Sequence, residues 1–179
     1  MIYFTADLHL GHAKIIQHCN RPFKHVKEMD DTLIANWNKI VNDDDTIYIL
    51  GDFTCKLSKS KTMGYLKRLP GRKILILGNH DNHIRKEYDG EKNKEVWYYF
   101  EKVTHYEEIM FDKKVICMFH YGIEHWHWRN RGAIHLCGHS HGNSTPTTNR
   151  IDVGVDCWDY KPVSIYQVLE KWEKVDHAR

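Results

Sequence analysis

The sequence has 179 residues, 41% hydrophobic and 28% charged, a composition typical of a soluble globular domain, and we expect one domain over residues 1–179. Its formal net charge of +2 is too small to indicate nucleic-acid binding, so a polyanion partner would require a local basic patch. Because it has neither a signal peptide nor an apolar run long enough to cross a membrane, we expect a cytoplasmic protein without membrane association.

The first half of the chain alternates predicted strands with predicted helices. Residues 2–6 and 46–50 are apolar and nearly continuous, as expected for strands that are covered on both faces. Apolar residues with helical spacing lie between them and predict an amphipathic helix. These residues are Met29, Leu33, Trp37, Ile40 and Val41. A second helix is predicted over residues 60–68, before a Leu-Pro-Gly sequence, and a third strand over residues 73–77.

Strands dominate the second half. Residues 82–105 are polar and predict a helix plus a loop, and residues 109–111 and 114–119 predict a hairpin. The further strands and the last helix are expected at residues 115–119, 133–137, 151–155 and 165–172. This order predicts an α/β fold in which the sheet is parallel at first and mixed later.

The cysteines and histidines restrict the chemistry. The five cysteines are odd in number and form no C-x-x-C pair, which argues against a zinc ribbon and against a secreted disulfide framework. Fourteen histidines are an unusually large number, and histidine is the commonest metal ligand. Because these histidines are distributed along the chain, their meaning depends on which of them converge in the fold.

Polar side chains follow five of the predicted strands, at the point where each strand ends. They are Asp7 with His9, Asp52, Asn79 with His80 and Asp81, His120, and His139 with His141. Ligand sites in α/β folds lie outside the carboxyl ends of strands. Residues two apart in an extended segment point to the same side, so each Asp-x-His or His-x-His pair can reach one ion. Glycines before three of these residues allow close approach of the backbone.

Taken in order, the segments D-x-H, G-D, G-N-H-D, H and G-H-x-H resemble the signature of the calcineurin-like metallophosphoesterases, over roughly residues 2–155. Residues 4–12, and Arg21-Pro22-Phe23 with the helix after them, also resemble the small bacterial and phage phosphoesterases of this superfamily. The resemblance implies a four-layer fold of two packed mixed β-sheets flanked by helices, with the site at the strand ends.

The resemblance also implies two divalent metal ions. Asp7, His9 and His141 would hold the first ion, Asn79, His120 and His139 the second, and Asp52 would bridge them. Such mixed ligands suit manganese, our first expectation, or iron, nickel or zinc. The implied activity is hydrolysis of a small phosphodiester or phosphomonoester by a metal-activated hydroxide, with His80 as the catalytic residue facing the substrate.

One departure from the family pattern narrows the class. The protein Ser/Thr phosphatases follow their bridging Asp with V-D-R-G, and the second Asp orients the catalytic histidine. Here Cys55 stands at that position, which disfavours a protein phosphatase and leaves open what orients His80. The adjacent Asp81 is one candidate.

Four further residues are candidate substrate contacts. His12 could contact a substrate phosphate or serve as a hydrogen-bonded loop residue, and Arg21 could contact phosphate or anchor a loop. Residues 121–131 interleave aromatic residues with Arg129 and Arg131, and predict either a specificity loop, in which a tryptophan stacks on a base, or a small satellite core. The expected substrate is a small phosphorylated molecule, with nucleotides among the candidates.

Two other functions compete with the enzyme hypothesis. A non-catalytic scaffold of the same fold would bind a protein partner, but scaffolds of this kind typically lose ligands or the catalytic histidine, and all are present here. A nuclease would act on DNA or RNA, which the small net charge and the lack of extra domains disfavour. The sequence does not define an oligomeric state.

Overall fold

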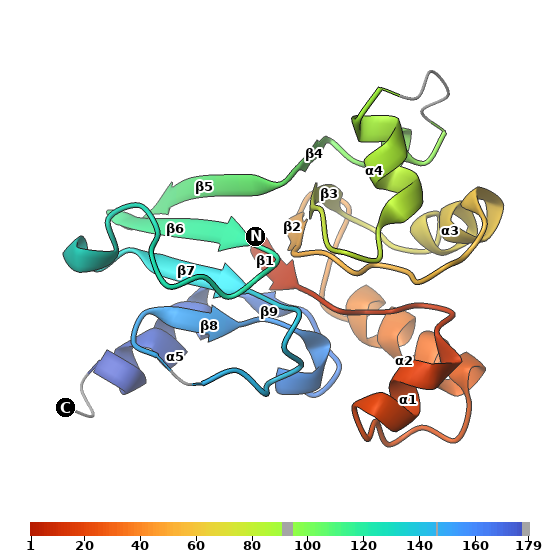
Figure 1. Ribbon diagram of the computed structural model, residues 1–179, viewed down its shortest axis with the longest axis horizontal. Helices are drawn as coiled ribbons and strands as arrows, with labels where there is room; N and C mark the ends of the chain where they lie inside the picture. The colour runs from red at the N-terminus through yellow and green to blue at the C-terminus, as the bar shows by residue number, and fades with distance from the viewer. Residues whose placement is uncertain (91–94, 146, 177–179) are drawn as a thin grey trace.

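Two β-sheets pack face to face in the computed structural model, which describes residues 1–90, 95–145 and 147–176 (Figure 1). The first sheet has the strand order β4-β3-β2-β1-β9 and the second has the order β5-β6-β7-β8. In the first sheet β1 to β4 are parallel and β9 is antiparallel to β1. In the second, β6 to β8 are parallel and β5 is antiparallel. The predicted α/β fold of two mixed sheets flanked by helices is therefore confirmed.

The strands of the first sheet are β1 Ile2–Thr5, β2 Thr46–Ile49, β3 Arg72–Ile76, β4 Lys102–Thr104 and β9 Val163–Ser164. Those of the second are β5 Tyr106–Phe111, β6 Lys114–Phe119, β7 Ile134–Cys137 and β8 Arg150–Asp152. The helices are α1 Ala13–His18, α2 Val26–Asn38, α3 Lys59–Leu66, α4 Asn82–Tyr88 and α5 Ile165–Asp176. Short 3₁₀ turns are η1 Trp97–Tyr99, η2 Arg129–Arg131 and η3 Val155–Cys157.

Most predicted elements are present within three residues of their expected ends. The helix α5 continues four residues past its expected end at residue 172, and the strand expected at residues 151–155 is shorter than predicted. It ends at Asp152 because the carboxylate of that residue accepts a hydrogen bond from the Gly154 amide, 2.7 Å away, and turns the chain. The sequence reading missed α1, β4 and β9, which are too short to show a clear periodicity.

Alternating faces of the strands divide the core into two clusters. On the outer face of the first sheet, Ile49 and Leu75 pack against Met29 and Trp37 of α2. Between the two sheets, Phe4 and other apolar residues of the first sheet meet apolar residues of β6 and β7. The helix α2 is capped where it begins, since the His25 side chain accepts from the Glu28 amide at 3.2 Å.

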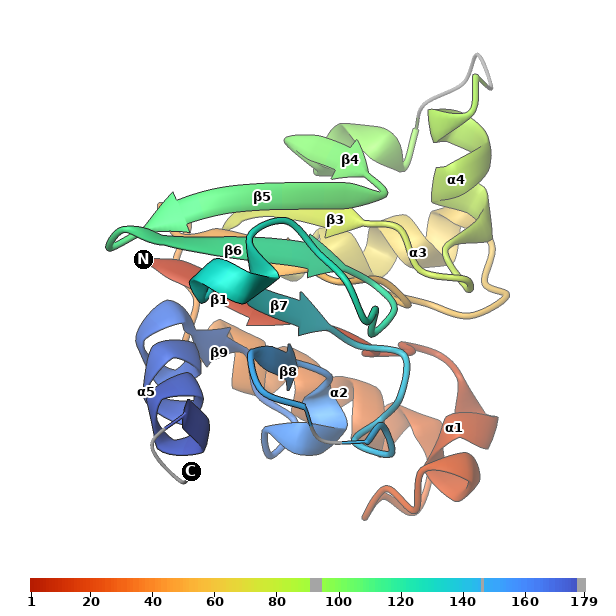
Figure 2. The same ribbon diagram turned by 60° about the vertical axis from the view of Figure 1, so that its left-hand side comes forward.

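The outer face of the second sheet is covered by the segment of residues 121–132 (Figure 2). Trp126 packs there on Val115, Cys117 and Ala133, and its indole donates to the Ala133 carbonyl at 3.0 Å. The predicted satellite core under this loop is therefore present at Trp126.

Among residues 1–90, 95–145 and 147–176, no helix combines the length and apolar character needed to cross a bilayer.

Candidate metal centre

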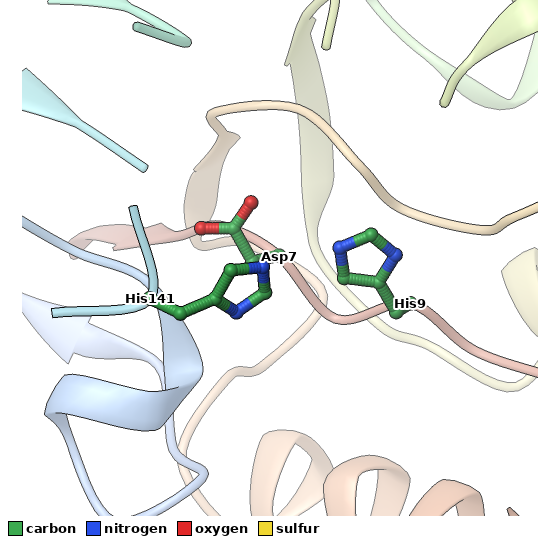
Figure 3. Close-up of side chains that lie close together, drawn as sticks. All are labelled: Asp7, His9 and His141. Carbon is green, nitrogen blue, oxygen red and sulfur yellow. The ribbon is translucent and has the colours of Figure 1, made fainter. Parts of the chain in front are cut away.

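The predicted ligands converge where the carboxyl ends of strands from both sheets meet. Ligand atoms of Asp7, His9 and His141 lie within 4.8 Å of one another, and Figure 3 shows these three side chains together. Asp52, His120 and His139 form a second group within the same limit. Asn79 joins this second group, because its Oδ1 lies 3.1 Å from His120 Nε2. All seven predicted ligands thus belong to one site.

Asp52 lies between the two groups. Its Oδ2 is 3.5 Å from His9 Nε2 and 3.7 Å from His120 Nε2. Its other oxygen, Oδ1, accepts a hydrogen bond from the His80 amide at 2.8 Å, which fixes the orientation of the carboxylate. One oxygen therefore faces both groups, as a bridging ligand must.

Five of the ligands have a left-handed backbone. They are Asp7, His9, Asp52, His139 and His141, with φ between 49° and 68°. The expectation of extended segments around Asp7 and around His139 is therefore wrong, although both pairs do converge. Each left-handed non-glycine residue costs about 1–3 kcal/mol and persists where the surrounding structure imposes it. The strain bends each loop so that consecutive ligands turn into the site.

Backbone and carboxylate hydrogen bonds hold these loops. The Asp7 and His9 amides donate to the Gly51 and Asp52 carbonyls at 3.1 and 2.9 Å. Asp7 Oδ2 accepts from the His139 amide at 2.8 Å, which ties the loop after β7 to the loop after β1. A Cβ at Gly138 would lie 2.6 Å from that same oxygen, so only glycine fits this close approach.

In two of the histidines, the hydrogen bond at Nδ1 shows which ring nitrogen has a lone pair available for a ligand. His120 Nδ1 lies 2.7 Å from the Leu50 carbonyl, which can only accept, so Nδ1 carries the proton and Nε2 has a free lone pair. His141 Nδ1 lies 2.7 Å from Asp156 Oδ2, which leaves its Nε2 free in the same way. A hydrogen bond of this kind on the outer nitrogen is the usual support of a metal-bound histidine.

The chemistry of the donor set fits a cation. Among the described residues, Asp7 Oδ1 and both nitrogens of His9 are buried without a hydrogen-bond partner. Burial, followed by the charge of Asp52, raises the pKa of Asp7 well above its usual value. Burial lowers the pKa of His9 to about 2 and that of His120 to about 4. Neutral imidazoles are ready ligands, and a divalent cation would offset the repulsion between the carboxylates.

His80 lies beside the two ligand groups. Its Nε2 is 3.9 Å from Asp52 Oδ2, and its Nδ1 is 3.4 Å from Cys55 Sγ. Burial raises the pKa of the Cys55 thiol, so the thiol keeps its proton, and its contact with Nδ1 holds the imidazole in place. The other ring nitrogen, Nε2, faces the ligand groups. Cys55 is therefore the group that orients His80.

Asp81 does not orient His80. Its two carboxylate oxygens accept from the backbone amides of Asp52, Phe53 and Gly78 at 2.8 to 2.9 Å. These bonds tie the loop after β3 to the loop after β2. Asp81 thus supports Asp52, because it accepts a hydrogen bond from the Asp52 amide.

His12 lies next to the site. Its ring centroid is 5.3 Å from that of His9 and 6.2 Å from that of His80. Burial lowers the pKa of His12, and its buried Nδ1 has no partner among the described residues. The structure thus brings His12 within range of a ligand at the site and shows no hydrogen bond that would define a loop-anchoring role.

Arg21 holds the loop after β1 by hydrogen bonds to its backbone. Its guanidinium binds both oxygens of Asp156 at 2.8 Å and donates to the carbonyls of Asp7 and Leu8 at 2.7 and 3.1 Å. The last N–H faces the Met29 sulfur, so all five donors are used. Of the two predicted roles, phosphate contact does not fit, and loop anchoring does.

Asp156 is a functional residue that the sequence reading missed. It joins Arg21 to His141. Burial raises the pKa of its carboxyl group, but the hydrogen bonds to His141 and Arg21 outweigh this effect and lower the pKa. Its position in the sequence could have identified it, since Asp156 directly follows the strand predicted at residues 151–155, as other site residues follow their strands. The chain Arg21–Asp156–His141 joins segments 135 residues apart.

Arg129 and Arg131 do not reach the site. They form η2, which precedes β7, whereas His139 follows the other end of that strand. A four-residue strand spans roughly 13 Å, so the two arginines lie at the opposite end of the second sheet (Figure 2). Their predicted contact with a substrate at the metal site therefore does not fit the structure.

Comparison with known proteins agrees with this geometry. The model of the calcineurin-like phosphoesterases matches residues 1–143. The chain belongs to the calcineurin-like phosphoesterase family. The predicted resemblance is thereby confirmed, and membership supports a metal-dependent phosphoesterase, in keeping with the His and Asp clusters.

Relatives of this family member occur in an archaeon and in phages. An uncharacterized protein of Methanocaldococcus jannaschii is 35% identical, with 97% of this chain and 92% of that protein covered. The gene 66 protein of Mycobacterium phage L5 is 32% identical, with 87% of this chain and 86% of the phage protein covered. A crystal structure of a protein of unknown function from Aquifex aeolicus has a TM-score of 0.72 at 27% identity, covering 95% of this chain and 98% of the other.

Proposed function

We propose that the chain hydrolyses a small phosphodiester or phosphomonoester with two divalent ions in the site. The ions would be held by Asp7, His9 and His141, by Asn79, His120 and His139, and by Asp52 between them. Imidazole, carboxylate and amide ligands suit manganese first, and iron, nickel or zinc as alternatives. When bound, such ions supply Lewis acidity toward the phosphoryl oxygens and the attacking water.

The observation that carries this proposal is the position of Asp52. Its free oxygen faces His9 on one side and His120 on the other, at 3.5 and 3.7 Å. The Asp81 bonds to the neighbouring backbone and the His80 amide bond to Oδ1 hold the carboxylate in that place. A single-ion site would not require one carboxylate oxygen to face two separate groups of ligands.

The side chains around the ligands provide hydrogen bonds to a bound phosphate ester. His80, oriented by Cys55, presents its Nε2 toward the ligand groups, where a proton on this nitrogen can be donated to a phosphoryl oxygen or to the leaving oxygen. His12 flanks it, and can contact the same phosphate. The His80 side chain is 33% exposed, so a ligand can reach it from solvent.

A substrate screen tests the proposal. Metal-loaded protein is assayed against phosphodiesters, phosphomonoesters, cyclic nucleotides and oligonucleotides, with metal content measured in parallel. Turnover of a small ester supports the proposal. Cleavage confined to oligonucleotides would instead indicate the nuclease, and full metal content with no turnover in any arm would indicate the non-catalytic scaffold.

His80→Ala separates binding from chemistry. Because His80 belongs to neither proposed ligand set, the variant should keep both ions and lose about 10²–10⁴ in kcat. The matched control is His18→Ala, which removes an exposed histidine of α1 and should change neither quantity. Undiminished turnover by His80→Ala would show that its assignment is wrong.

Asp52→Asn tests the bridge. Loss of one shared carboxylate should lower the occupancy of both ions, as measured by elemental analysis of protein loaded at a limiting metal concentration. The bridging role is refuted if both ions remain bound with unchanged affinity.

A further inference from the structure

A basic and aromatic surface lies far from the metal centre. Two adjoining hollows of about 280 and 300 Å³ share Trp128 and Arg131 in their walls. Four cations line them, namely Lys113, Lys114, Arg129 and Arg131, and none of the described residues in either wall is acidic. We call this surface the Trp128 patch. A net charge of +2 for the whole chain hides this local concentration of positive charge.

The tryptophan at its centre is held outward by a strained backbone. Trp128 is 44% exposed and has φ 56° and ψ 23°, a left-handed conformation that bulky residues rarely adopt. Its carbonyl accepts from the amides of Arg131 and Ala133 at 2.8 and 3.1 Å, which locks the turn. Strain of this kind persists where the surrounding structure imposes it, and it clusters at ligand-binding and switch regions.

The patch is rigid because its supporting loop is fastened to the sheet. Trp126 is anchored by its indole bond to Ala133, and the His127 carbonyl accepts from the Cys117 thiol at 3.6 Å. Arg129 and Arg131 lie over the rings of Trp126 and Trp128, at 5.3 and 5.5 Å from the ring centroids. The surface is therefore formed before any ligand arrives, which reduces the entropic cost of binding.

We infer that the Trp128 patch binds single-stranded nucleic acid. The four cations would contact consecutive phosphates, and the exposed indole between two hollows would stack on a base. Each hollow is near the lower end of the size range of small-ligand pockets, about 300 Å³, and the two adjoin at Trp128 and Arg131, so neighbouring nucleotides of one strand could occupy both. An acidic peptide would use the charges but would leave the aromatic centre without a function.

The patch is separate from catalysis. It lies beside the start of β6 at Lys114, whereas the ligand His120 follows the end of that strand. Changes in the patch should therefore leave the hydrolysis of a small ester unchanged. This inference does not depend on the proposed function, since a protein without any hydrolytic activity could still bind through this surface.

Fluorescence anisotropy with a fluorescein-labelled twelve-residue oligothymidylate tests the inference. The parent protein is metal-loaded His80→Ala, which keeps every proposed metal ligand and limits cleavage of the probe. We expect a Kd of about 1–100 µM. The slope of log affinity against log salt concentration should be roughly −1.4 to −2.8, as two to four phosphate contacts on a single strand predict. No binding at 50 mM salt, or binding that does not respond to salt, overturns the inference.

Two variants locate the binding. Trp128→Asn removes the ring and suits the left-handed backbone, and should weaken binding about fivefold to a hundredfold. Arg131→Gln should weaken it and reduce the salt slope by roughly 0.7. The matched control is Tyr98→Ala, which removes an aromatic residue that is 80% exposed elsewhere on the surface.

Unchanged affinity in both patch variants places the binding elsewhere and overturns the inference. Equal competition by polyglutamate and by unlabelled oligonucleotide, at matched charge, would also overturn it, because the surface would then recognise charge without stacking. If circular dichroism shows that Trp128→Asn is unfolded, the oligonucleotide affinity of Arg131→Gln alone tests the inference. This variant should fold, because the exposed guanidinium of Arg131 is not part of the core.

Discussion

Removal of the Asp156 carboxylate should destabilise the protein and weaken one metal position. Asp156 lies between Arg21 and His141, and the side chains of Arg21 and Asp156 are 0% and 8% exposed. Asp156→Ala leaves the guanidinium buried without its counter-charge, and breaking a buried pair in this way costs about 3–5 kcal/mol. For a chain of this length each kcal/mol lowers Tm by roughly 2–4 °C, so we expect a decrease of roughly 6–20 °C.

The same substitution should act on metal binding through His141. Without the carboxylate on Nδ1, the imidazole loses both its preferred tautomer and its fixed orientation. Loss of such a partner typically costs about 10–100-fold in metal affinity. Of the two proposed ions, only the one at Asp7, His9 and His141 should be affected, so a calorimetric titration should show one weakened and one unchanged site.

Thermal unfolding of metal-free protein, followed by the metal titration, separates the two effects. Arg21→Met in the Asp156→Ala background removes the uncompensated charge and should recover part of the lost stability. The matched control is Glu170→Gln, which breaks an exposed ion pair with Lys174 and should not shift Tm measurably. The proposed role of Asp156 is refuted if Asp156→Ala melts like the wild type and binds both ions with unchanged affinity.

The remaining predictions concern the orientation of His80 and two glycines. Cys55→Ala should lower kcat by about tenfold at most with little change in KM, because one neutral hydrogen bond is lost. Cys55→Ser should restore activity, because a hydroxyl can donate to or accept from Nδ1 as the thiol can. Equal kcat in the alanine variant would contradict this role. Gly51→Ala should abolish metal binding, since φ is +87° and the new Cβ would lie 2.4 Å from His120 Nδ1. Gly64→Ala is its counterpart in α3, with no atom within 4 Å of the new Cβ, and should raise the free energy of unfolding by about 0.5–1 kcal/mol in a urea titration.

The sequence by itself predicted which side chains converge at the site, and it predicted most of the strands. The reason is that both are local properties. A continuous apolar run such as residues 46–50 can only be a covered element, and a carboxylate directly after it must lie at that element's end. The amphipathic face of α2 is visible for the same reason, since its spacing fixes which residues share a side. These patterns predicted that Asp7, Asp52 and His120 would meet.

The tertiary structure decided what lies around the ligands. Cys55 and Asp81 were both near His80 in sequence, but only the packing of the loops shows that the thiol faces the imidazole and the carboxylate faces backbone amides. Asp156 was missed, because its partner Arg21 is 135 residues away and no periodicity links them. The left-handed conformation of the ligands was also not predicted, since loop closure imposes it against the local preference of those residues.

The loop of residues 121–131 shows most clearly the difference between what the sequence predicts and what the tertiary structure decides. From the sequence, residues 121–131 follow a metal ligand directly, and nearness along the chain predicted a contact with the substrate. In the structure the loop returns along the outer face of β6 and β7, packs Trp126 on the sheet and places Arg131 at the far end of the sheet. The sequence determined which chemical groups this protein carries and where its strands end. Only the tertiary structure decided which groups share a surface, because that depends on how the chain returns across the sheets after each strand.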